Sequence, residues 1–218
     1  MIAPEDAPWN QQFARFLMRG LARTPVDPNH VTFLSFLAGL AAAVLFALGE
    51  SGAADLAAAA FIVAMFLDHA DGELARLSGR SSRLGHRLDY LVGAANYTML
   101  FIGLGVGQSW ATPWMLALGL AAWLSNPVIV AVRMSLERRC GSQAVRHPRL
   151  GGIEIEDFAY LIGPITWLGD CSYFFLAYGF GALGYLLWTL WRYRRWTKPR
   201  ESWGNQGMGV RARLPRNR

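Results

Sequence analysis

Long apolar runs separated by short polar segments predict helices that cross a membrane. Several of these runs approach the ~20 residues that a helix needs to span the hydrocarbon core. We expect spans at residues 31–48, 54–67, 88–106, 115–132, 153–168 and 173–191. The run at 153–168 is the weakest candidate, because acids occupy its first turns and Pro164 interrupts it. The pattern predicts an all-α polytopic membrane protein of about six transmembrane helices.

An amphipathic helix is predicted before the first of these runs. Between residues 9 and 23, apolar and basic residues alternate with helical spacing, which is typical of a helix lying in the membrane interface. The apolar positions are Phe13, Phe16, Leu17 and Leu21, and the basic positions are Arg15, Arg19 and Arg23. A soluble helix packed on a cytoplasmic loop is the alternative.

These patterns divide the chain into three segments. Residues 1–29 would form the interfacial helix and a turn, and residues 30–192 a single six-helix membrane domain. Residues 193–218 are basic and poor in apolar residues, which predicts a disordered cytoplasmic tail that meets anionic lipid headgroups. Nucleic-acid binding is not expected, since the tail adjoins a membrane domain and offers no aromatic stacking platform.

The basic residues predict the orientation in the membrane. The chain of 218 residues has 21 Lys and Arg residues and is 53% hydrophobic. No Lys or Arg lies in the turns near residues 49–55, 107–113 and 169–172, whereas the opposite turns and both termini are basic. By the positive-inside rule, both termini face the cytoplasm. A bacterial-type inner membrane is the expected location.

Carboxylates gather between the second and third predicted spans. Asp68 and Asp71 are three residues apart and share a helix face, which the small residues Gly72 and Ala75 continue. On the next helix Asp89 lies in a stripe with Gly85 and Gly93, each four residues away. Three carboxylates on facing helices are suited to holding Mg²⁺ or Mn²⁺ together with a phosphate. For any single acid, a solvated, salt-bridged loop is the alternative.

This stretch resembles the signature of the CDP-alcohol phosphatidyltransferase family, D-x2-D-G-x2-A-R-x8-9-G-x3-D-x3-D. Seven positions match in residue and spacing: Asp68, Asp71, Gly72, Ala75, Arg76, Gly85 and Asp89. The eighth does not, because Gly93 stands where the family has a last aspartate, a metal ligand and general base. The segment Pro28-Asn29-x2-Thr32 is also similar to the family, whose members often begin their first span with P-N-x2-T.

The resemblance implies an activity and a set of site residues. The activity is transfer of a phosphatidyl group from a CDP-linked donor, with CDP-diacylglycerol as the expected lipid, to an alcohol with release of CMP. A divalent cofactor and a homodimer are also implied. The implied metal ligands are Asp68, Asp71 and Asp89, and the implied nucleotide-binding residues are Asn29, Thr32, Gly72, Ala75, Arg76 and Gly85. The implied acceptor-binding residues are Arg133, Arg138 and Arg139, which positive-inside anchoring would equally explain.

Gly93 leaves alternatives open. His86 lies close to the stripe that carries Asp89 and is a candidate surrogate base, although it would equally face water or bind a phosphate. The chain is then either a working transferase or a catalytically impaired homologue that binds CDP-lipid or partners an active subunit. A transporter with coincidental acids is disfavoured by seven matched positions. The residues leave the donor and the acceptor unspecified.

Overall fold

A computed structural model describes residues 9–107, 112–145, 149–150 and 153–197 of the chain. The α-helices are α1 (Trp9–Leu21), α2 (Pro28–Ala47), α3 (Ser51–Ser78), α4 (Arg83–Gly107), α5 (Pro113–Cys140), α6 (Ile162–Leu168) and α7 (Cys171–Thr197). Two 3-10 helices, η2 (Ser142–Val145) and η3 (Ile155–Leu161), flank a hairpin of β1 (Arg149–Leu150) and β2 (Ile153–Glu154).

The all-α membrane fold predicted from the apolar runs is confirmed. Within the described residues, five helices are long and apolar enough to cross a membrane, namely α2, α3, α4, α5 and α7. The expected count of about six is therefore close. α3 and α4 run well beyond their apolar runs, so the carboxylates lie on the helices themselves.

The segment predicted as a sixth span, residues 153–168, has a different structure. It forms β2, η3 and the seven-residue helix α6, and none of these is long enough to cross a membrane. The acids explain the difference. Glu154 caps η3 in a capping box with Asp157, so the chain satisfies these polar groups in a short turn before α6 begins.

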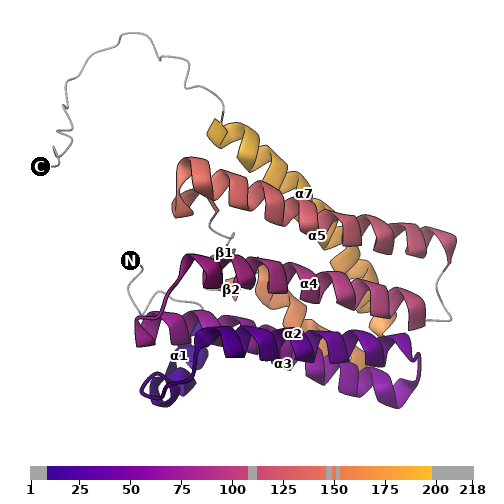
Figure 1. Cartoon of the computed structure of the whole chain (residues 1–218). Coiled ribbons are helices and arrows are strands. Elements are labelled where there is room, and N and C mark those ends of the chain that lie inside the picture. Colours follow the sequence, from indigo (N-terminus) through magenta and orange to yellow (C-terminus); the bar gives the residue numbers. More distant parts are fainter. Residues whose placement is uncertain (1–8, 108–111, 146–148, 151–152, 198–218) are drawn as a thin grey trace, which may run out of the picture.

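The helices form two packed groups that meet along α4 and α5 (Figure 1). In the first group α2 packs against both α3 and α4, and in the second α5 packs against α7. Gly103 lets α2 and α4 approach closely, because it has no side chain. A Cβ at this position would overlap the backbone of Ala43. The contact lies near the C-terminal ends of both helices, whereas the acids lie near the start of α4.

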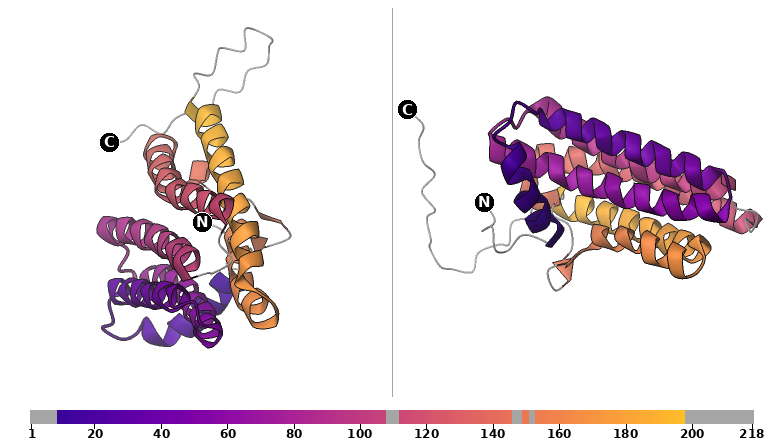
Figure 2. Two further views of the ribbon diagram at one scale, coloured as in Figure 1. Left: turned by 90° about the vertical axis from the view of Figure 1, so that its right-hand side faces the viewer. Right: turned by 90° about the horizontal axis from the view of Figure 1, so that it is seen from below.

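The predicted amphipathic helix is present as α1. It lies across the end of the bundle and packs on α3 (Figure 2). Asn10 and Ala14 are buried on its inner face, whereas Phe13, Phe16 and Leu17 are exposed on its outer face. At the other terminus α7 continues to Thr197, so the first residues of the predicted tail are helical. Residues 198–218 of that tail lie outside the described residues.

Candidate functional site

A short connection brings the acids of α3 and α4 to one end of the bundle. α3 ends at Ser78 and is capped by Gly79, whose φ of 69° is a left-handed conformation that glycine adopts easily. α4 begins three residues after Arg80, and the Ser82 hydroxyl accepts a hydrogen bond from the backbone N of Gly85 at 2.9 Å. That contact is typical of a helix N-cap. Both helices consequently present their acids beside the same loop.

Asp71 is buried and held by the start of α2. The hydroxyl of Thr32 donates a hydrogen bond to Asp71 Oδ2. Asp27 caps α2 by accepting from the backbone N of Asn29 at 2.8 Å, which fixes the turn from which Thr32 projects. Thr32, predicted to bind nucleotide, therefore also orients a carboxylate, a contact that the sequence spacing did not reveal.

A cavity of about 140 Å³ lies beside Asp71, between the starts of α2 and α4 and the end of α3. Its walls include all of the predicted nucleotide-binding residues: Asn29, Thr32, Gly72, Ala75, Arg76 and Gly85. Asp89 and His86 also line it. The structure thus brings together residues from three helices that were grouped only by their resemblance to a family signature.

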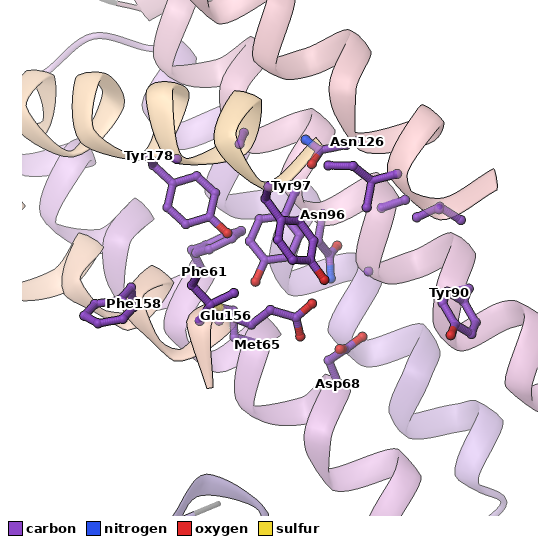
Figure 3. A pocket seen from close by; sticks show the side chains of 18 of the residues that line it. Phe61, Met65, Asp68, Tyr90, Asn96, Tyr97, Asn126, Glu156, Phe158 and Tyr178 are labelled. Carbon is purple, nitrogen blue, oxygen red and sulfur yellow. The ribbon is translucent and has the colours of Figure 1, made fainter. Parts of the chain in front are cut away.

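A larger cavity, of about 570 Å³, lies between the two groups of helices (Figure 3). Asp68, Asp89 and Gly93 line its polar end. Aromatic and aliphatic side chains line the rest, with the rings of Tyr97 and Tyr178 stacked 5.7 Å apart. Since Asp89 and His86 line both cavities, the two spaces adjoin at the start of α4.

The three predicted metal ligands divide between these cavities. Asp68 faces the larger, Asp71 the smaller and Asp89 both. The carboxylate of Asp68 lies near enough to those of Asp71 and Asp89 to interact with them electrostatically. Within the described residues, no three His, Cys, Asp or Glu side chains form a group already placed to hold a metal ion.

The chemistry of the donors nevertheless fits a hard divalent cation. Asp68 Oδ1 is buried and has no hydrogen-bond partner. A buried, unsatisfied carboxylate oxygen is costly unless a cation or a proton compensates it. Carboxylate oxygens beside a phosphate-sized cavity are the ligands that Mg²⁺ and Mn²⁺ prefer. The residues present therefore fit such an ion, and their role as its ligands stays a prediction.

His86, the candidate surrogate base, has a carboxylate partner on α5. Its Nε2 lies 3.1 Å from Glu137 Oε2, and the hydroxyl of Tyr90 donates to the same oxygen at 3.3 Å. The pairing links α4 to α5 at the rim of the site. No local pattern predicts this pairing, because the partners are 51 residues apart.

The three predicted acceptor-binding arginines occupy different environments. Arg133 is buried, lines the larger cavity and donates to the hydroxyl of Tyr185. Arg138 and Arg139 are exposed, and neither lines either cavity. Only Arg133 of the three is thus placed where an acceptor in the larger cavity would meet it.

Two arginines near the end of α3 also line the smaller cavity. Arg76 Nη2 donates to Glu73 Oε1 at 2.8 Å, and its guanidinium lies over Gly72. Arg80 donates to the backbone oxygens of Val26 and Thr24, at 2.6 and 2.7 Å, and so ties the α1–α2 loop to the end of α3.

A buried polar network anchors η3 beside the acids. The side-chain N of Asn10 donates to Asp157 Oδ1 at 2.6 Å and lies 3.0 Å from His69 Nε2. His69 Nδ1 lies 2.8 Å from the backbone oxygen of Met65. Burial raises the pKa of Asp157 above its ordinary value. The N-terminal helix α1, α3 and η3 are thereby joined one residue away from Asp68.

Comparison with known proteins assigns the chain to a family. A sequence model of the CDP-alcohol phosphatidyltransferases matches residues 26–196, which include both cavities and the helices that form them. The chain belongs to the CDP-alcohol phosphatidyltransferase family. The resemblance inferred from the signature is thereby confirmed, and the chain is an integral membrane protein. Members of this family use divalent metal ions.

A solved structure shows the same fold. It is described as Mycobacterium tuberculosis phosphatidylinositol phosphate synthase (PgsA1) with CDP-DAG bound. The TM-score is 0.65 at 20% sequence identity, and the match covers 91% of this chain and 100% of that one. No curated protein sequence matches the chain significantly.

Proposed function

We propose that this CDP-alcohol phosphatidyltransferase homologue is an active enzyme that transfers a phosphatidyl group from CDP-diacylglycerol to an alcohol and releases CMP. The observation that carries the proposal is the pair of adjoining cavities. One is lined by every residue of the signature expected to bind the nucleotide, the other is large and mostly apolar, and Asp89 borders both. The bound CDP-DAG in the structural neighbour supports a CDP-lipid as the donor.

The two cavities suggest where each part of the reaction takes place. The cytidine diphosphate would occupy the smaller cavity, where Gly72 and Gly85 leave the backbone accessible, and the acceptor would enter the larger one. Asp68, Asp71 and Asp89 would hold the cation, and neutralisation of the diphosphate charge is the chemistry that it supplies when bound. The acceptor hydroxyl oxygen would then form a bond to the phosphorus next to the lipid and give up its proton, for which His86 beside Glu137 is the candidate base, while the bond from that phosphorus to the oxygen of CMP breaks.

The arginines of the larger cavity and its rim would bind a charged acceptor. Arg133 is the best placed, because its guanidinium is buried in the cavity wall with Tyr185. Arg138 and Arg139 would contact only an acceptor that extends to the surface, or anionic lipid headgroups. The imidazole of His86 would lie near the acceptor, and its contact with Glu137 would orient the ring.

The charges support a cytoplasmic site. α3 ends and α4 begins at one end of the bundle, and α5 and α7 end there with basic residues in their last turns. The described turns at the other end, between α2 and α3 and between α6 and α7, contain no Lys or Arg. By the positive-inside rule the carboxylates face the cytoplasm.

One observation favours the alternative of a catalytically impaired homologue. Position 93 faces the carboxylate of Asp68, but glycine offers no acid there. A general base typically contributes about 10²- to 10⁴-fold to a rate. A homologue without a replacement for this acid would bind a CDP-lipid and release little CMP.

Release of CMP distinguishes the two functions. The purified protein in vesicles is incubated with CDP-diacylglycerol, Mg²⁺ or Mn²⁺ and in turn glycerol, glycerol 3-phosphate and an inositol phosphate. We expect CMP and a new phosphodiester lipid with at least one acceptor, and neither product when EDTA removes the metal. Metal-dependent binding of the donor without CMP release would establish the impaired homologue, and absence of donor binding would refute both functions.

A further inference from the structure

The side of Asp68 that faces α4 is open. A Cβ built at Gly93 would lie 3.8 Å from Asp68 Oδ1 and 4.0 Å from Asp68 Oδ2, with no closer neighbour outside its own helix. These are ordinary contact distances, so the position has room for a side chain. Asp68 Oδ1, which faces this space, is buried without a hydrogen-bond partner. A buried carboxylate oxygen of Asp68 is therefore directed toward position 93 on α4, where glycine supplies no ligand.

Glu156 also lines this larger cavity. It belongs to η3, a segment about sixty residues beyond the signature in the chain. In Figure 3 its carboxylate points into the part of the cavity that Asp68 lines. The carboxylate is also near enough to Asp68 and Asp89 to interact with both electrostatically. A fourth acid thus reaches the site from an element outside the signature.

The turn that carries Glu156 is held on both sides. Asp157 Oδ2 accepts from the backbone N of Glu154 at 2.9 Å, which closes the first turn of η3. The other oxygen of Asp157 accepts from Asn10, which reaches His69 on α3. These contacts fix η3 relative to the residue next to Asp68. These contacts therefore hold the turn that carries Glu156 beside the cavity.

Gathering this carboxylate with the others has an electrostatic cost. Like charges at short range in a partly buried site repel each other unless a cation or a proton enters. The other two acids of the segment form the capping box of η3, whereas Glu156 lines the cavity. A cation bound among these carboxylates would attract each of them and so offset the repulsion between them.

We infer that Glu156 is the fourth carboxylate of the divalent-cation site and takes the place of the acid that Gly93 does not provide. The inference rests on the proposed function, because it assigns a ligand within the same site. The cation would then be bound by acids from α3, α4 and η3 rather than from α3 and α4 alone. This arrangement would let a member of the family bind its cation with glycine at position 93.

Titration of the protein with Mn²⁺ in the presence of CDP tests the inference without requiring turnover. We expect Glu156→Gln, which keeps the shape of the side chain, to weaken Mn²⁺ binding by about 10- to 100-fold, as loss of a metal-site partner typically does. Adding Gly93→Asp to Glu156→Gln should restore the affinity to near that of the unaltered protein. Glu50→Gln, which removes an exposed carboxylate at the far end of the bundle, should leave the titration unchanged.

Two outcomes would overturn the inference. One is a Glu156→Gln titration identical to that of the unaltered protein, with both proteins melting at the same temperature. The other is a loss of Mn²⁺ affinity that Gly93→Asp fails to restore, which would assign Glu156 to another task. If both variants melt early, Glu156→Asp, which keeps the charge, replaces Glu156→Gln and should give an intermediate affinity.

The same proteins separate this inference from the proposed function. If the unaltered protein releases CMP and Glu156→Gln does so equally fast and binds Mn²⁺ equally well, the function stands and the inference fails. If the unaltered protein binds Mn²⁺ through Glu156 but neither binds CDP-diacylglycerol nor releases CMP, the cation site stands and the proposed function fails.

Discussion

Replacing Asp71 by Asn is expected to abolish metal-dependent binding of CDP. Asp71 is buried between α2 and α3 and lines the smaller cavity, where Asp89 is the other carboxylate among the described lining residues. Asparagine keeps the shape of the side chain and still accepts from Thr32. The change therefore removes the charge while it preserves the packing.

The rate of CMP release should fall together with binding. A cation that neutralises charge in phosphoryl transfer contributes several kcal/mol, so we expect a loss of roughly 10³-fold or more. Asp55→Asn, on the exposed far end of α3, is the matched control and should leave binding and release unchanged. Equal affinity of Asp71→Asn and the unaltered protein for CDP with Mn²⁺, measured by calorimetry, would contradict the assignment of this residue.

Filling the smaller cavity should block the nucleotide without touching a carboxylate. A Cβ at Gly85 would lie 3.1 Å from Ser82 Oγ and 3.2 Å from Asn29 Oδ1, so the larger side chain of Gly85→Val must enter a cavity of about 140 Å³. Overpacking of this kind costs about 1–3 kcal/mol, which corresponds to roughly 10- to 100-fold in the affinity for CDP.

The same helix provides the control for Gly85→Val. Gly105 has no neighbour within 4 Å of a built Cβ, so Gly105→Val should leave CDP affinity unchanged. Mn²⁺ binding measured without nucleotide should be the same in both variants, because neither changes an acid. If Gly85→Val binds CDP as tightly as Gly105→Val does, the nucleotide does not occupy this cavity.

The sequence predicted the elements that depend on local pattern. Long apolar runs identify membrane helices because burial in lipid requires them, and the spacing of Asp68, Asp71 and Asp89 follows from helix geometry. The N-terminal helix was predicted from the helical spacing of its apolar and basic residues. The span predicted at 153–168 was wrong, because a short apolar stretch is compatible with several structures. The acids of this stretch favour a turn over a membrane span.

The remaining features of the site depend on contacts between distant segments. Thr32 and Asp71 are 39 residues apart, and Asn10 and Asp157 are 147 residues apart. No periodicity within either segment indicates that they meet. The presence of Glu156 in the same cavity as Gly93 and the pairing of His86 with Glu137 likewise depend on how distant segments pack together. Such pairings could be found only from the folded chain.

The position of the cation tests the central claim most directly. The claim is that acids of α3 and α4, completed by η3, hold a divalent ion between a nucleotide cavity and an acceptor cavity. Crystals of the protein grown with CDP and Mn²⁺ should show an anomalous peak among the carboxylates of Asp68, Asp71, Asp89 and Glu156, with the diphosphate beside Gly72 and Gly85. A peak elsewhere, or CDP bound in this place with no peak at these carboxylates, would contradict the account.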